Sequence, residues 1–323
     1  MSRFVGAAPI HNTRKRIIIE ESTNVNIRQL VEDHPEIQRD RFDLSFGPGA
    51  SADVARALSH HGVVMLRGAL SERTLERCRR TFERFAQSLG KRRLPDWAWG
   101  ERDEGPDPEW AEGEAETGSW HKPWTVRHWN RRPAATVISA MVESWAWPVM
   151  EEICGTTDIA VLLGLCLARH AIDVDLGVGA HQDAKGLPPI VPFSAWVPMH
   201  DVVPGFKSGL GFVVRPPDTV LPTLPHGDIG PDYVLENIDR VWVPTYRAGD
   251  LTIHTNRIPH FTTGYGTRSD RYSLEVRAMA REAAPWRFHN PCVYVGRPDG
   301  VPLITGAHCD LPVRANGFVA SFR

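Results

Sequence analysis

The spacing of hydrophobic residues predicts a helix in the first third of the chain. One set recurs three and four residues apart, as on one face of a helix: Leu75, Cys78, Phe82, Phe85 and Leu89. Ser71 stands where an N-cap belongs, because its hydroxyl can accept a free backbone N–H, and Gly90 ends the pattern. Before this helix, residues 50–61 predict a shorter helix that stops at Gly62, and residues 63–66 predict a buried strand.

After residue 155 the pattern changes to short strands. Seven runs rich in Val, Ile, Phe, Tyr and Trp are separated by Gly, Pro and Asp: residues 159–167, 192–202, 210–214, 240–246, 251–255, 260–264 and 271–279. Strands of this length and spacing are typical of a sandwich or jelly roll. We therefore expect a mainly β fold with α-helices, in which the helices come first and a β-rich body follows.

Three further segments complete the expected organisation. Residues 1–45 are polar and lack periodicity, so we expect an N-terminal arm. Residues 46–290 would form the main domain, and residues 291–323 a C-terminal extension. Within the domain, residues 101–118 are acidic and contain two prolines, which predicts a solvated loop.

The segment 91–132 around that loop combines tryptophans with cations. It holds six of the chain's 11 tryptophans: Trp97, Trp99, Trp110, Trp120, Trp124 and Trp129. Such a segment can cover a substrate as a lid, or its tryptophans can simply fix a loop to the core. Under the lid interpretation, the candidate substrate-binding residues are Trp120, His121, Lys122 and Trp124.

Composition narrows the class of protein. A formal net charge of -2 and a pI near 6.7 give no basic surface for nucleic acid. The five cysteines contain no C-x-x-C pair, which argues against a disulfide framework or a structural zinc site and favours the reducing cytoplasm. The N-terminus lacks the apolar run of a signal peptide, and no stretch suggests a membrane span. We expect a cytoplasmic protein whose partner is a small molecule.

A His-x-Asp/Glu pattern offers candidate metal ligands but is weak by itself. It occurs four times, at His34/Glu36, His181/Asp183, His226/Asp228 and His308/Asp310. Residues two apart on a strand share a face, and two His with one carboxylate form a facial triad that leaves iron positions open. His181/Asp183 lies between two predicted strands, and the long interval before His260 has room for the intervening strands. Spacing alone leaves chance as the alternative.

The segment 249–277 strengthens the case for a metal site. It contains a strand, a histidine, a turn and a second strand that begins at Arg271, where Arg271, Ser273 and Glu275 alternate with apolar neighbours. An inward guanidinium beside a hydroxyl suits the distal carboxylate of 2-oxoglutarate through a bidentate pair. The alternative is that Arg271 is a surface charge.

At this point the sequence resembles the phytanoyl-CoA dioxygenase family of iron(II)- and 2-oxoglutarate-dependent oxygenases, between residues 42 and 279. Four patches in order carry the resemblance: HGVVMLRGALSERTLERCR, then HQD at 181–183, then SAWVPMHDVVPGFKSGLGFVVRP, and finally the spacing of Asp250, His260 and Arg271. The family's usual N-P-G turn is replaced here by P-G-F-K-S-G. The resemblance implies a double-stranded β-helix, a distorted jelly roll with helices packed outside.

The resemblance also implies the cofactors Fe(II), 2-oxoglutarate and O2. His181, Asp183 and His260 would be the metal ligands, and Arg271 would anchor 2-oxoglutarate. Four further positions match those that often line the co-substrate pocket: Gln182, Trp196, Thr262 and Ser273. His254 is the rival distal ligand, although its spacing does not match the family. No catalytic residue beyond the metal ligands is expected.

The implied reaction is oxidation of a substrate C–H bond, by hydroxylation, desaturation, epoxidation or ring formation. Halogenases of this type lack the carboxylate ligand, so the presence of Asp183 argues against halogenation. The many tryptophans favour a bulky natural-product intermediate of secondary metabolism. Two alternatives come from other classes: a cupin-like metal-dependent isomerase or lyase, and a non-catalytic relative that acts as a binding module.

Overall fold

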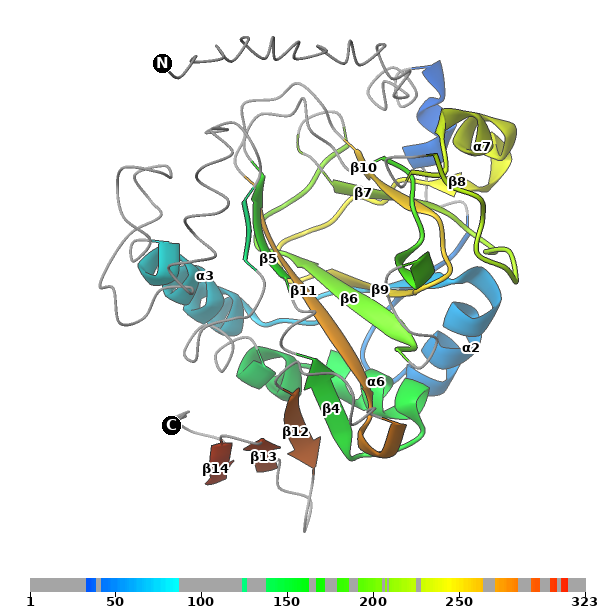
Figure 1. The fold of residues 1–323 in the computed structure, drawn as a ribbon. Coiled ribbons are helices and arrows are strands. Elements are labelled where there is room, and N and C mark those ends of the chain that lie inside the picture. The colour runs from blue at the N-terminus through cyan, green and yellow to red at the C-terminus, as the bar shows by residue number, and fades with distance from the viewer. Residues whose placement is uncertain are drawn as a thin grey trace, which may run out of the picture.

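The computed structural model describes a jelly-roll body with helices outside it (Figure 1). The described residues are 33–38, 42–86, 124–126, 138–162, 167–171, 179–185, 191–204, 207, 209–224, 228–263, 271–283, 292–296, 303–306 and 309–312. The helices and 3-10 turns are η1 (Pro35–Gln38), α2 (Ser51–His61), α3 (Glu72–Ala86), α6 (Ala146–Cys154), η4 (Asp183–Lys185), α7 (Pro231–Glu236), η5 (Ile238–Arg240) and η6 (Arg281–Ala283).

Two sheets make up the body. The path of the larger sheet is β1 (Ser45–Phe46), β2 (Val63–Leu66), β9 (Leu251–Thr255), β6 (Phe193–Pro198), β11 (Arg271–Ala280), β4 (Ile159–Leu162), β12 (Cys292–Gly296), β13 (Leu303–Gly306) and β14 (Cys309–Pro312). β5 (Leu167–Ala171) also pairs with β11, and β3 (Trp124–Val126) pairs with β5. The smaller sheet has the order β10 (His260–Thr263), β7 (Gly209–Val213) and β8 (Val241–Trp242). The predicted mainly β fold class is confirmed.

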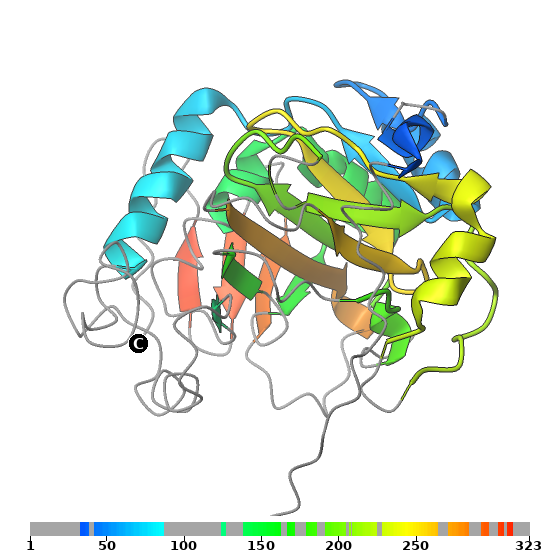
Figure 2. The ribbon, with the colours of Figure 1, turned by 90° about the horizontal axis from the view of Figure 1, so that it is seen from above.

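Alternation along the central strands gives the larger sheet two different faces. On β6, Ser194 and Trp196 point to the inside of the body, whereas Ala195 and Val197 join the outer core. A cluster of buried residues from both sheets fills much of the inside: Leu44, Val63, Met65, Trp196, Val202, Leu210, Phe212, Val214, Trp242, Tyr246 and Ile258. We call this the inner cluster. The two sheets thus enclose an interior between them, as Figure 2 shows from above.

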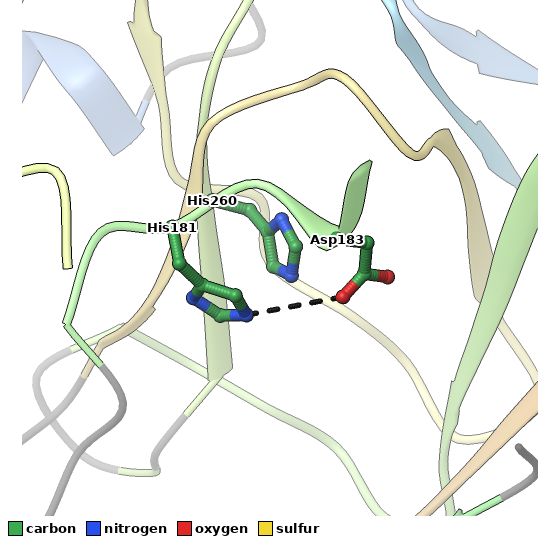
Figure 3. Close-up of side chains that lie close together, drawn as sticks. All are labelled: His181, Asp183 and His260. Atoms are coloured by element: carbon green, nitrogen blue, oxygen red, sulfur yellow. Dashed lines mark ion pairs between the residues drawn. The ribbon is translucent and has the colours of Figure 1, made fainter. Parts of the chain in front are cut away.

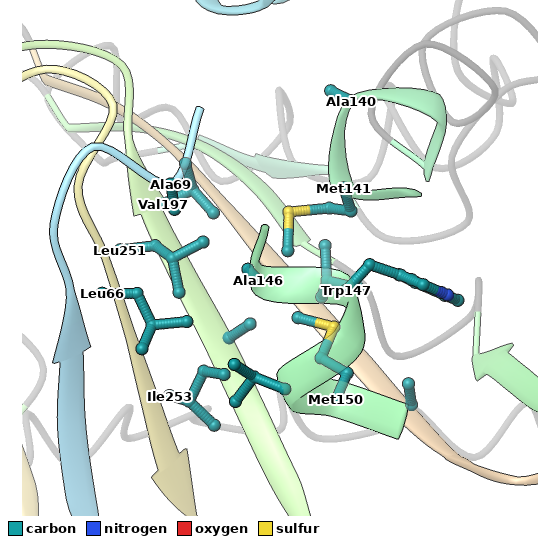
Figure 4. Close-up of a cluster of buried hydrophobic side chains, with 14 of the residues drawn as sticks. Leu66, Ala69, Ala140, Met141, Ala146, Trp147, Met150, Val197, Leu251 and Ile253 are labelled. Carbon is teal, nitrogen blue, oxygen red and sulfur yellow. The ribbon is translucent and has the colours of Figure 1, made fainter. Parts of the chain in front are cut away.

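Helices cover the outer face of the larger sheet. Trp147 and Met150 of α6 pack with Leu66, Val197 and Ile253 from three adjacent strands, and all five side chains are buried (Figure 4). Burying each large apolar side chain contributes about 1.5–3 kcal/mol, so this core ties the helices firmly to the sheet.

Two helix ends follow the predicted signals, whereas Gly90, the predicted end of the second helix, lies outside the described residues. Gly62 ends α2 in the left-handed conformation, at a φ of 79°, and its N–H donates to the Leu58 carbonyl at 2.8 Å. Before α3, the Ser71 hydroxyl accepts the Thr74 N–H at 3.2 Å, which is the predicted N-cap contact. None of the described helices has both the length and the apolar character to cross a bilayer.

The predicted boundary segments are described only in part. Residues 1–32 lie outside the described residues, but Ile37 and Leu44 of the expected N-terminal arm are buried in the body. Most of the lid-like segment 91–132 is also outside them, β3 excepted. Part of the expected C-terminal extension adds strands β12 to β14 beyond β4.

The Gly249–Asp250 pair links the turn before β9 to residues 67–70, which follow β2. Asp250 is buried, and its carboxylate accepts the Gly68 N–H at 2.8 Å, the Arg67 guanidinium at 2.8 Å and the Arg247 N–H at 2.9 Å. Gly249 has a φ of 93°, and its carbonyl accepts the Leu70 N–H at 3.0 Å. Gly249 and Asp250 therefore have a structural role, since they fix the start of β9.

Replacing Gly249 by alanine is expected to destabilise the protein by at least about 1–2 kcal/mol. The left-handed φ is costly for a residue with a Cβ, and that Cβ would lie 2.5 Å from the Leu70 carbonyl oxygen. Urea unfolding measures the change. Gly47→Ala is the matched control, because a Cβ there meets nothing within 4 Å. Equal stability of the two variants would contradict this account of the turn.

Candidate metal centre

Backbone pairing brings two distant histidines together. The N–H of His181 donates to the His260 carbonyl at 3.0 Å, and the N–H of His260 donates to the His181 carbonyl at 2.9 Å. This bridge adds residue 181 to the edge of the smaller sheet beside β10, with the two imidazole rings 4.2 Å apart. Asp183 follows at the start of η4, and its Oδ1 lies 4.0 Å from His181 Nε2 (Figure 3).

The three side chains form a compact donor set. One ligand atom from each of His181, Asp183 and His260 lies within 4.8 Å of the others. His260 and Asp183 are nearly inaccessible to solvent, with side-chain exposure of about a tenth for Asp183, whereas His181 is 28% exposed. The set is thus closed on one side and open at His181, which is the arrangement that a metal with exchangeable positions requires.

Hydrogen bonds fix the tautomer of both histidines. Nδ1 of His181 donates to the Gly179 carbonyl at 2.9 Å, and Nδ1 of His260 donates to the Ile258 carbonyl at 3.1 Å. Because a carbonyl only accepts, each Nδ1 carries the hydrogen, and in the neutral imidazole it is Nε2 that has the lone pair. Metal-binding histidines are commonly oriented in this way by a backbone acceptor. The donor atoms therefore fit a divalent cation.

Electrostatics keep the donors in the forms that bind metal. Burial, with nearby His181 and His254, lowers the pKa of His260 to about 3, so its imidazole is neutral near pH 7. Burial by itself would raise the pKa of Asp183, but the Arg277 guanidinium and the surrounding histidines hold that pKa well below the usual range. Asp183 is thus an anion, as a metal ligand must be.

The two oxygens of Asp183 have different partners. Oδ1 faces His181, whereas Oδ2 accepts the Ser194 hydroxyl at 2.9 Å and Arg277 Nη2 at 3.1 Å. Arg277 Nη2 also donates to Glu275 Oε1 at 2.6 Å, and Arg277 Nε donates to Ser194 Oγ at 3.1 Å. These donors leave one oxygen of the carboxylate directed toward the histidines.

His254 forms a second possible group with Asp183 and Glu275. Ligand atoms of these three also lie within 4.8 Å of one another, and His254 Nε2 is 4.0 Å from Asp183 Oδ2. However, neither ring nitrogen of His254 has a hydrogen-bond partner among the described residues, so no acceptor there sets its tautomer. The Arg277 guanidinium already bonds to both carboxylates, and its charge disfavours a cation there. His181, Asp183 and His260 are the better metal group.

The residues predicted to line the co-substrate pocket occupy different places. Thr262 and Ser273 are buried on β10 and β11, and Trp196 packs against Tyr246 with ring centroids 4.9 Å apart. The Gln182 amide instead donates to the Arg257 carbonyl at 2.5 Å and accepts the Leu221 N–H at 2.7 Å. These bonds hold Gln182 within the turn that contains His181 and Asp183.

Arg271 and the predicted substrate residues are described less fully. Arg271 begins β11, where its backbone pairs with Ala171 of β5, and its side chain is outside the description. Trp120, His121 and Lys122 lie outside the described residues. Trp124 begins β3, which pairs with β5, and β5 in turn pairs with the first half of β11.

Ser194, Arg277 and the pairing of Arg277 with Glu275 were not among the predicted site features. A sequence signal exists for the arginine, because it continues the two-residue alternation of Arg271, Ser273 and Glu275 along one strand. Ser194 has no such signal. Its position opposite Arg277 comes from the register of β6 against β11, which links distant segments.

No protein-family model matches this chain, and no curated protein matches it. Among solved structures, it is similar to the non-haem alpha-ketoglutarate-dependent carbocyclase SnoK from nogalamycin biosynthesis, with a TM-score of 0.50, 17% identity and coverage of 77% of this chain and 89% of SnoK. The epimerase SnoN in complex with Fe3+, alpha-ketoglutarate and nogalamycin RO gives a TM-score of 0.46 at 17% identity, over 83% of this chain and 96% of SnoN. The likeness to SnoK shows a shared fold.

Acid is expected to destabilise the metal-free protein through its buried histidines. Burial lowers the pKa of His254 to about 4 and, with its neighbours, that of His260 to about 3, both from 6.5. Between about pH 4 and 6.5 the unfolded chain therefore binds more protons. Stability falls with decreasing pH in this window, by about 1.4 kcal/mol per pH unit for each histidine. Below it, Asp183 acts in the same direction, because its lowered pKa gives stability that is lost on protonation.

Urea unfolding between pH 5 and 7, with a chelator present, measures this dependence for wild type and His254→Gln. The variant should show a shallower slope, by about one proton, since glutamine does not titrate. His60→Gln is the control, because His60 is exposed on α2. A slope in His254→Gln equal to that of wild type would contradict the expectation.

Proposed function

We propose that this protein is an iron(II)- and 2-oxoglutarate-dependent oxygenase of the phytanoyl-CoA dioxygenase type. One observation carries the proposal: two histidines with backbone-fixed Nδ1–H groups and one anionic carboxylate converge inside a jelly roll. Two His and one carboxylate are the donor set of non-haem iron(II) oxygenases. The shared fold with SnoK and the four sequence patches add support.

In this proposal His181, Asp183 and His260 hold the iron. When bound, iron(II) with 2-oxoglutarate and O2 supplies the oxidising chemistry, while the co-substrate is converted to succinate and carbon dioxide. The contribution of the protein is to orient these groups. The tautomers of His181 and His260 direct each Nε2 inward, and Ser194 and Arg277 orient the carboxylate of Asp183.

The interior between the metal group and the start of β11 is the proposed position of 2-oxoglutarate. The hydroxyls of Thr262 and Ser273 are buried on the strands that border it, and Arg271 stands two residues before Ser273. A guanidinium can hold the distal carboxylate with two parallel hydrogen bonds. The apolar inner cluster excludes water from this region, which strengthens such bonds.

Anaerobic titration with iron(II) and then 2-oxoglutarate tests both cofactors through the visible charge-transfer band of their complex. Wild type should develop the band, and His260→Ala should not, because the variant lacks a ligand. Arg271→Ala should require about 10- to 100-fold more 2-oxoglutarate, the effect of losing a charged hydrogen-bonded pair. His60→Ala and Arg56→Ala, both at exposed positions of α2, are the matched controls.

Other outcomes of this titration select the alternatives. If wild type binds iron but 2-oxoglutarate produces no band, the cupin-like isomerase or lyase takes precedence. If it binds neither, the non-catalytic binding relative is the better description.

For the substrate, we propose a bulky, aromatic or polycyclic natural-product intermediate that is oxidised at a C–H bond. The tryptophan-rich segment 91–132 supports this, because its strand β3 pairs with β5, and β5 in turn pairs with the first half of β11, where Arg271 stands. Aromatic side chains bind apolar rings well. SnoK and SnoN, described as enzymes of nogalamycin biosynthesis, illustrate the class of molecule to test first.

Polycyclic aromatic compounds should therefore perturb the visible band of the iron and 2-oxoglutarate complex, and acyl-CoA thioesters should not. Alanine at Trp120, Trp124 or Trp129 should weaken this response to the compound by about tenfold, the loss of roughly 1–1.5 kcal/mol of aromatic contact. The band before the compound is added serves as the internal control for an intact metal site. Unchanged responses in all three variants would rule out the lid.

A further inference from the structure

We propose that Arg277 is a positioning residue that limits Asp183 to one metal-facing oxygen and so keeps coordination positions open for 2-oxoglutarate. This inference rests on the proposed function, because it concerns the same metal group. Its basis is the unequal surroundings of the two oxygens: Oδ1 faces His181, whereas Oδ2 accepts both Arg277 and Ser194.

We call the contacts of Arg277 and Ser194 with Oδ2 of Asp183 the clamp. The register of the sheet fixes the positions of both donors. Arg277 of β11 pairs directly with Ser194 of β6, so the two donors to Oδ2 come from opposed positions on adjacent strands. They also bond to each other, from Arg277 Nε to Ser194 Oγ at 3.1 Å. Arg277 is 7% exposed and Ser194 is fully buried. Charge-assisted hydrogen bonds in such an interior are stronger than on the surface.

Glu275 also binds the guanidinium of Arg277. Its Oε1 accepts Arg277 Nη2 at 2.6 Å, the same nitrogen that donates to Asp183. One cation thus holds two carboxylates that would otherwise both be free to bind a metal. His254 Nε2 lies 4.0 Å from the same oxygen of Asp183 that accepts Arg277. Arg277 therefore supplies the positive charge beside the two carboxylates, Asp183 and Glu275, of the second group, which also contains His254.

Loss of Arg277 has two opposing effects on the metal, and this decides the choice of measurement. The loss frees Oδ2 of Asp183, but it also removes a positive charge near the cation, which favours metal binding. Metal affinity alone is therefore a poor readout. The informative quantities are the coordination of the metal and the affinity for 2-oxoglutarate, because freed carboxylate oxygens compete for the open positions.

Cobalt(II) provides both quantities, since its visible absorption reports the number and type of ligands. The purified full-length protein is freed of metal, loaded with cobalt(II) and titrated with 2-oxoglutarate. Arg277→Met should bind cobalt(II) with an altered spectrum and require at least about tenfold more 2-oxoglutarate than wild type. Arg277→Lys, which retains the charge and a donor, should recover part of the wild-type spectrum and affinity.

Arg281→Met is the matched control, because Arg281 follows the same strand but is 50% exposed and pairs with Asp158. It should behave as wild type. Ser194→Ala removes only the other donor to Oδ2, and it should shift the spectrum in the same direction as Arg277→Met but less. This variant tests the clamp even if Arg277→Met does not fold.

Each outcome separates the clamp from the proposed function. A wild-type spectrum and 2-oxoglutarate response in Arg277→Met, or in Ser194→Ala if only that variant folds, would overturn the clamp while the oxygenase proposal stands. An altered variant spectrum with no 2-oxoglutarate response in wild type would support the clamp and contradict the co-substrate assignment. Failure of wild type to bind cobalt(II) would overturn both.

Discussion

The site depends on the reciprocal backbone hydrogen bonds between His181 and His260. These bonds join the segment before η4 to the first residue of β10, at the edge of the smaller sheet. Because the pairing is made by the backbone, it places two histidines side by side whatever else surrounds them. Asp183 then reaches across to β6 and β11 of the larger sheet through Ser194 and Arg277. The metal group therefore connects the two sheets.

The interior of the body has a polar and an apolar part. His254, Ser194 and Arg277 surround Asp183, while Phe212 and Trp242 belong to the adjoining inner cluster. Burial of so many polar groups would be costly if they were unpaired. Asp183, Arg277 and Glu275 offset this cost by bonding to one another, and His254 reduces its own cost by remaining neutral. A bound metal would add further compensation for the carboxylate.

The similarity to SnoK concerns the fold. The reaction depends on the residues of the site. Identity is only 17%, yet the chains share the jelly roll over most of their lengths. SnoK is described as a carbocyclase, but one fold can carry different reactions, which depend on the groups around the site. In this protein those groups include Ser194 and Arg277, which hold Asp183.

The sequence by itself determined the fold class and the caps at Ser71 and Gly62, because local spacing and alternation encode these features. The candidate ligands His181, Asp183 and His260 came from its resemblance to a known family. Only the tertiary structure decided which nitrogen of each histidine is free, that Gln182 bonds to neighbouring loops, and that Arg277 bonds to Asp183. The physical reason is register. A shift of one residue between β6 and β11 would turn Ser194 away from Arg277, and that register arises from contacts between segments far apart in the chain.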